Sequence, residues 1–117
     1  MPELILHFEA PKGTDPKTMA AHIEETMGAL ADVESAKARA ERTRGGEIEM
    51  IILVVNVATL VITKTAAFLS AVNSLAEAWK KLRARFPTAS TPTIEIMGEE
   101  VPLDKVTAEH AADAIAG

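Results

Sequence analysis

The stretch that decides the fold is residues 50–62, MIILVVNVATLVI, in which only Asn56 is neither apolar nor a threonine. A run of this composition can be a membrane segment, a buried strand, or the buried half of a longer helix. Because each alternative predicts a different kind of protein, the flanking sequence has to discriminate between them.

Charged residues close to the run argue against a membrane-spanning helix. Only fourteen residues separate Glu49 from Lys64, whereas a spanning helix needs about 20 predominantly apolar residues. Insertion of residues 48–72 would bury Asn56, several threonines and Lys64 in lipid. Membrane insertion is therefore an alternative that we do not favour.

A strand is the second alternative, because isoleucine, valine and threonine favour sheets. However, no proline and no glycine interrupts residues 47–86, and a strand that fills such a stretch would be unusually long. We favour one long helix over residues 47–86 whose first half is buried all round. A small sheet would not cover such a helix completely, so we expect a partner chain or self-association to cover the rest.

The second half of this segment has the periodicity of an amphipathic helix that ends before Pro87. Its large apolar residues recur at intervals of four and three: Phe68, Val72, Leu75, Trp79, Leu82 and Phe86. The first five would bind a partner if a partner covers this face; the alternative is that each belongs to the core. Basic residues follow at the helix C-terminus, where they suit the helix dipole and would steer a charged partner: Lys80, Lys81, Arg83 and Arg85.

The remaining elements flank this segment. Residues 3–10 are apolar on both faces, which predicts an inner strand, and Asp15-Pro16 begins a helix over residues 16–31. Residues 33–44 alternate alanine with Lys37 and Arg39, which favours a strand with a basic outer face over a helix. Residues 94–103 read as a hairpin around Gly98, and Thr107 caps a short final helix. The sequence thus predicts a single α+β domain, residues 1–117, in the order β-α-β-α-β-β-α.

The sequence lacks the residue patterns of most catalytic sites. There is no cysteine, and the three histidines have no metal-ligand spacing. The serines lack the GxSxG context of a hydrolase, and no glycine-rich phosphate loop is present. A net charge of −5 and a low aromatic content argue against nucleic acid as a partner. We therefore expect no enzyme, no metal and no cofactor, and a cytoplasmic protein, since the N-terminus does not read as a secretory signal.

Charge is segregated along the chain. A basic cluster in the middle contains Lys37, Arg39, Arg42 and Arg44. After residue 87, Lys105 is the only basic residue among six carboxylates: Glu95, Glu99, Glu100, Asp104, Glu109 and Asp113. Such segregation favours head-to-tail association or docking to a partner.

The order of elements, together with two motifs, resembles the effector-associated constant component family of bacterial conflict systems. The motifs are WKKLRAR at residues 79–85 and the hairpin IEIMGEEVPLD at residues 94–104. The resemblance covers about residues 30–116 and implies a small accessory protein encoded beside proteases, pore formers or signalling NTPases. It implies no catalytic residues. We expect an interaction module that self-assembles or recruits an effector; the alternative is a membrane-active component that inserts residues 48–72.

Overall fold

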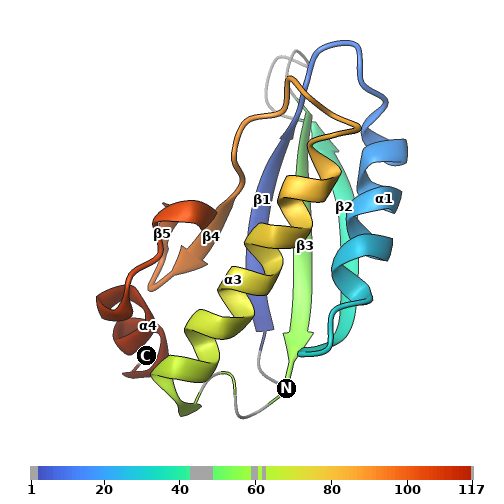
Figure 1. Ribbon diagram of the computed structural model, residues 1–117. Coiled ribbons are helices and arrows are strands. Elements are labelled where there is room, and N and C mark those ends of the chain that lie inside the picture. The colour runs from blue at the N-terminus through green and yellow to red at the C-terminus, as the bar shows by residue number, and fades with distance from the viewer. Residues whose placement is uncertain (1–2, 43–48, 59–60, 62, 117) are drawn as a thin grey trace.

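A computed structural model describes residues 3–42, 49–58, 61 and 63–116 (Figure 1). Its sheet is antiparallel throughout and has the strand order β2-β3-β1-β4-β5. The strands are β1 (Glu3–Ala10), β2 (Val33–Arg42), β3 (Glu49–Val57), β4 (Thr93–Ile96) and β5 (Glu99–Pro102). The helices are α1 (Pro16–Gly28), α3 (Thr65–Leu82) and α4 (Ala108–Ala116), and a 3₁₀ turn, η1 (Leu103–Lys105), follows β5.

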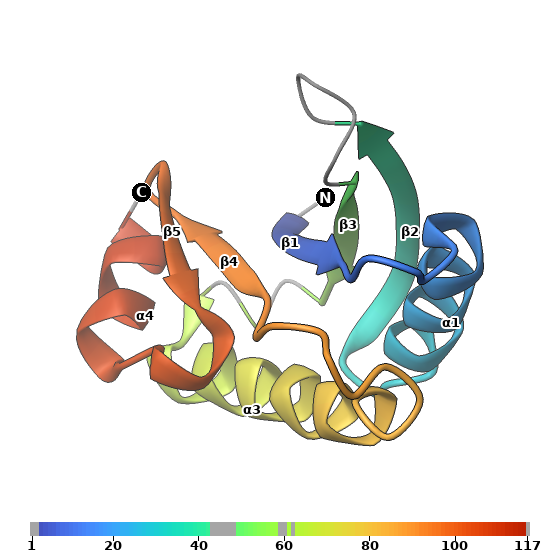
Figure 2. The same ribbon diagram turned by 90° about the horizontal axis from the view of Figure 1, so that it is seen from above.

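Helices α1 and α3 cover the same face of the sheet, and α4 packs against α3 and β4 (Figure 2). The elements from β1 to β4 follow the β-α-β-β-α-β order of the ferredoxin-like arrangement. The β5 strand, η1 and α4 extend this unit at one edge. The predicted α+β class, the C-terminal hairpin and the short final helix are confirmed.

The leading strand is an inner strand, as its sequence predicts. The β1 strand pairs with β3 from Glu3 to Ala10 and with β4 on its other side. Leu4, Leu6 and Phe8 are buried beneath the helices, while the side chains between them lie on the opposite face. A strand in this position needs apolar residues on both faces, which explains the ELILHF pattern.

The long helix predicted for residues 47–86 is wrong in its first half. Glu49–Val57 is the strand β3, paired with β1 on one side and with β2 on the other. The long helix of the second half is α3, which begins at Thr65 and ends at Leu82. In the strand, burial alternates with period two: the residues that face the helices are at most 1% exposed, namely Ile51, Leu53, Val55 and Val57.

The register of β3 explains why a polar residue, Asn56, stands in the otherwise apolar residues 50–62. It lies on the face opposite the helices, and its side-chain amide donates a hydrogen bond to Ser35 Oγ of β2 at 2.9 Å. The amide therefore has a hydrogen-bond partner at a part-buried position between two strands. A helix buried all round would have left it among apolar side chains.

Side-chain hydrogen bonds lie at the starts of two helices. The Thr18 hydroxyl donates to Asp15 Oδ2 at 2.6 Å, and this hydrogen bond lowers the pKa of the Asp15 carboxyl. At α4, the His110 backbone N–H donates to Thr107 Oγ1 at 3.3 Å. The Thr107 N–H donates in return to His110 Nδ1 at 3.0 Å, which gives a capping box with histidine in the role of glutamate. The predicted Thr107 cap is confirmed.

The β4–β5 hairpin turns on Met97 and Gly98, both with positive φ, at +53° and +80°. This is the type I′ geometry that favours Asn-Gly. We expect Gly98→Ala to lower the free energy of unfolding by about 1 kcal/mol, because alanine disfavours positive φ. Met97→Asn should raise it by about 0.5 kcal/mol. Thermal unfolding followed by circular dichroism measures both; a neutral Gly98→Ala would contradict the turn.

Candidate interaction surface

The apolar stripe of α3 lies in the hydrophobic core. Each of its five members singled out from the sequence is at most 4% exposed: Phe68, Val72, Leu75, Trp79 and Leu82. The Trp79 ring lies 5.4 Å from the ring of Phe8, centroid to centroid, in a tilted arrangement. These side chains therefore pack against the sheet of their own chain, which is the alternative that the sequence left open.

The basic residues at the end of α3 are exposed: Lys80, Lys81, Arg83 and Arg85. Lys80 Nζ lies 3.2 Å from Glu77 Oε1, and both side chains are about two-thirds exposed. Solvent-exposed ion pairs of this kind contribute at most about 1 kcal/mol. These exposed cations are placed to attract an anionic partner from solution.

Lys81 and Arg85 line a groove between α1 and α3. The groove also contains His22, whose ring packs edge-on against Phe86 at 5.9 Å, and Ser74, whose hydroxyl donates to the Ser70 carbonyl at 3.1 Å. A nucleophilic serine needs a base within hydrogen-bond reach, and Ser74 is instead bonded to its own helix. Within the described residues, no three histidine, aspartate or glutamate side chains converge on a metal-sized site.

The sheet face opposite α1 and α3, which we call the open face, is covered by none of the described helices (Figure 2). Its middle is apolar. Four half-buried side chains from β1 and β3 form this apolar centre: Ile5, Met50, Ile52 and Val54. On β2, Lys37 lies beside Val54 and Arg39 lies beside Ile52. The aliphatic stems of such long side chains shield apolar neighbours from water.

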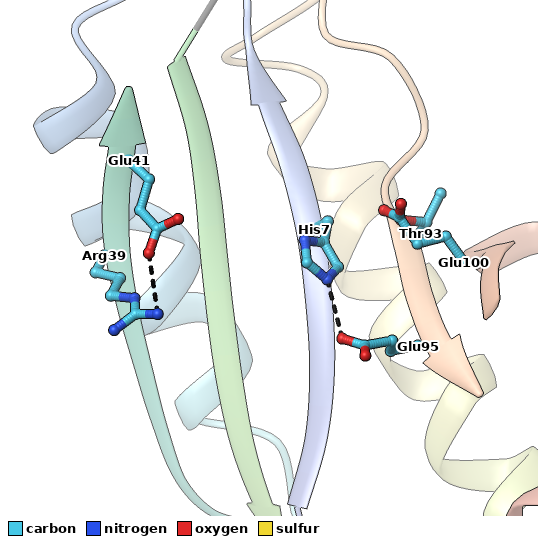
Figure 3. Close-up of polar contacts among 6 residues, drawn as sticks. All are labelled: His7, Arg39, Glu41, Thr93, Glu95 and Glu100. Atoms are coloured by element: carbon cyan, nitrogen blue, oxygen red, sulfur yellow. Dashed lines mark hydrogen bonds and ion pairs between the residues drawn. The ribbon is translucent and has the colours of Figure 1, made fainter. Parts of the chain in front are cut away.

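Charged side chains of β2 and of the β4–β5 hairpin lie on the two sides of β3 and β1 (Figure 3). On the β2 side, Arg39 Nη2 lies 2.9 Å from Glu41 Oε1, and the Arg39 side chain is 71% exposed. On the other side, the β4–β5 hairpin presents Glu95 and Glu100, which the strand register places directly opposite each other. The open face therefore has a net cationic edge, on which Lys37 and Arg39 outnumber Glu41, and an anionic edge of Glu95 and Glu100.

The anionic edge is held in place by hydrogen bonds. His7 Nε2 lies 3.2 Å from Glu95 Oε2, and the Thr93 hydroxyl donates to Glu100 Oε1 at 2.9 Å (Figure 3). These contacts orient both carboxylates on the open face. Between β2 and β3 a shallow hollow of about 650 Å³ reaches down to Ile52 and Val54.

The open face gathers residues that the sequence analysis noted separately. The basic cluster contributes Lys37 and Arg39, whereas the Arg42 side chain and Arg44 lie outside the described residues. The apolar centre was missed, because β3 is apolar on both faces and shows no alternation to read. Two observations together could have predicted the apolar centre. They are the strand alternative for residues 50–62 and the basic outer face of residues 33–44.

Among the residues that the structure describes, no helix combines enough length and hydropathy to cross a bilayer. No known family model matches the chain, and no curated protein or solved structure shows significant similarity to it. A functional interpretation therefore depends on the geometry of the chain itself.

Proposed function

We propose that the chain is a non-enzymatic interaction module whose open face docks a protein, by self-assembly or by recruitment of an effector. The observation that carries this proposal is the apolar centre between two charged edges. When an antiparallel sheet is covered by helices on one face only, its other face normally carries polar residues. Here β3 presents Met50, Ile52 and Val54 on that face. An apolar centre with a charged rim is the usual anatomy of a protein–protein interface.

The biological setting that we propose is a cytoplasmic bacterial conflict system, where the module would serve a protease, pore former or NTPase. The support is the resemblance of the WKKLRAR segment and the C-terminal hairpin to the effector-associated constant component family. Membrane insertion of residues 48–72 is not favoured by any contact that we observe. It would require β3 to leave its hydrogen-bonded partners on both sides.

The test is phage resistance in a bacterial host that carries the gene among its natural neighbours. Deletion of the gene should raise phage plating efficiency at least about tenfold, and the wild-type gene should restore resistance. Ile52→Asp should fail to restore it, because a carboxylate in the apolar centre would be desolvated by a docked partner. The matched control is Met97→Asp, which replaces an apolar side chain that is 67% exposed in the hairpin turn.

Two outcomes would contradict the proposal. Unchanged plating after deletion would rule out the role in a conflict system. Full complementation by Ile52→Asp, with normal accumulation of the variant protein, would show that the open face does not dock the functional partner.

A further inference from the structure

We infer that the open face binds a second copy of this chain, sheet against sheet, about a two-fold axis that runs parallel to the strands. This inference rests on the proposed function and specifies its partner. The argument uses the position of the charged edges, the level of each charge along the strands, and the area of the face.

The charged edges determine the direction of the axis. Rotation about an axis parallel to the strands exchanges the two edges of the sheet, so β2 of each copy comes to lie over the β4–β5 hairpin of the other. Lys37 and Arg39 then face the carboxylates of Glu95 and Glu100. An axis perpendicular to the strands would instead stack β2 on β2 and hairpin on hairpin, and like charges so placed oppose association.

The strand register places these charges at the same level. Lys37 lies beside Val54, and Val54 lies beside Ile5. His7 lies beside Thr93, and two residues further along this register Glu95, with Glu100 opposite it, comes level with Ile5. Rotation about an axis parallel to the strands preserves level, so Lys37 of one copy meets the carboxylate pair of the other without any shift of the two sheets.

The same rotation places the apolar centres against each other. With the axis between β1 and β3, β1 of each copy lies over β3 of the other and β2 lies over β4, so Ile5 packs against Val54 of the other copy and Lys37 meets Glu95. Stacked sheets lie about 10 Å apart with their side chains interdigitated. Such an interface is self-complementary, as a two-fold dimer requires.

The area of the face predicts a reversible dimer. The strands β1, β2 and β3 contain eight to ten residues, but β4 and β5 contain only four each. At about 3.3 Å per residue, the face is therefore roughly 27 Å long over one half of its width and roughly 13 Å long over the other half. Two copies together would bury roughly 800 Å², which is the size of a weak, transient interface. We therefore expect a dissociation constant in the micromolar range and a monomer–dimer equilibrium that depends on concentration.

Sedimentation equilibrium of the full chain with charge-reversal variants tests the inference. Lys37→Glu and Glu95→Lys should each weaken dimerisation about tenfold or more, because each variant brings like charges together. The double variant should recover to within about threefold of the wild type. Within one chain β2 and β4 are about 14 Å apart, with two strands between them, so recovery would report contact between copies. Ile52→Asp should remain monomeric at every concentration.

The matched control is Lys81→Glu, which makes the same charge change at an exposed residue of α3, on the other side of the sheet. It should leave the dissociation constant unchanged. A monomer at all concentrations, a double variant without recovery, or weaker association caused by Lys81→Glu would each overturn the inference. A monomeric protein whose Ile52→Asp variant still loses phage resistance would overturn the dimer alone and leave the proposed function standing with an effector as partner.

Thiol crosslinking tests the direction of the axis independently, because the natural chain has no cysteine. A short bifunctional maleimide suits two sheets about 10 Å apart, a separation that a disulfide cannot span. Ile5→Cys, close to the axis, should crosslink to itself, whereas Lys37→Cys should not. Efficient self-crosslinking of Lys37→Cys together with none for Ile5→Cys would indicate an axis perpendicular to the strands and overturn the proposed geometry.

Discussion

Leu53→Ala is expected to lower the free energy of unfolding by about 2–5 kcal/mol, whereas Ile52→Ala should cost about 1 kcal/mol or less. The two residues are neighbours in β3, but Leu53 is fully buried beneath the helices and Ile52 lies half-buried on the open face. Truncation of Leu53 removes buried surface and leaves a cavity that the packed core cannot fill. Truncation of Ile52 leaves a space that water can enter.

Urea unfolding followed by circular dichroism measures this difference, at a protein concentration low enough for the chain to be monomeric. The comparison distinguishes the strand from the helix expected from the sequence. In a helix buried all round, the two truncations would destabilise the protein equally. Equal losses would therefore contradict the alternating burial of β3.

Trp79→Ala is expected to cost about 3–5 kcal/mol, because the indole is 4% exposed and packs on the Phe8 ring. Trp79→Phe should cost far less, about 1 kcal/mol. The Trp79 Nε1 donor is buried and has no hydrogen-bond partner among the described residues, and a buried unpaired donor costs about 1–3 kcal/mol. Phenylalanine removes that cost while it keeps an aromatic ring against Phe8.

Urea unfolding of both Trp79 variants, again followed by circular dichroism, gives the two free energies. Phe8→Ala serves as a companion, since it removes the same ring contact from the sheet side. If Trp79→Phe proves as destabilising as Trp79→Ala, the indole N–H forms a hydrogen bond that stabilises the core.

The sequence predicts those elements that have a clear apolar periodicity or a proline or glycine at their ends. The 4-3-4-3-4 spacing from Phe68 to Phe86 identified α3 and its buried face, Pro16 marked the start of α1, and Gly98 marked the hairpin. The alternation of alanine with Lys37 and Arg39 gave β2 against the helix propensity of its residues. In each case the pattern and the local signals agree, which is the condition for a reliable prediction.

The boundary between β3 and α3 could not be predicted. Neither glycine nor proline marks it, and an apolar run buried on one face and half-buried on the other has no period. Non-local pairing decides the structure there, because β1 and β2 each present a free edge that β3 fills. The open face was missed for the same reason, since Ile5 and Ile52 come together only through that pairing.

One measurement tests the central claim most directly, namely methyl NMR of isoleucine-, leucine- and valine-labelled protein at two concentrations. If two copies associate through the open face, the methyl shifts of Ile5, Ile52 and Val54 should change with concentration. Those of Leu53 and Val55, which face the helices from the same strand, should stay in place. Shifts that do not depend on concentration, or changes confined to α1 and α3, would contradict the account.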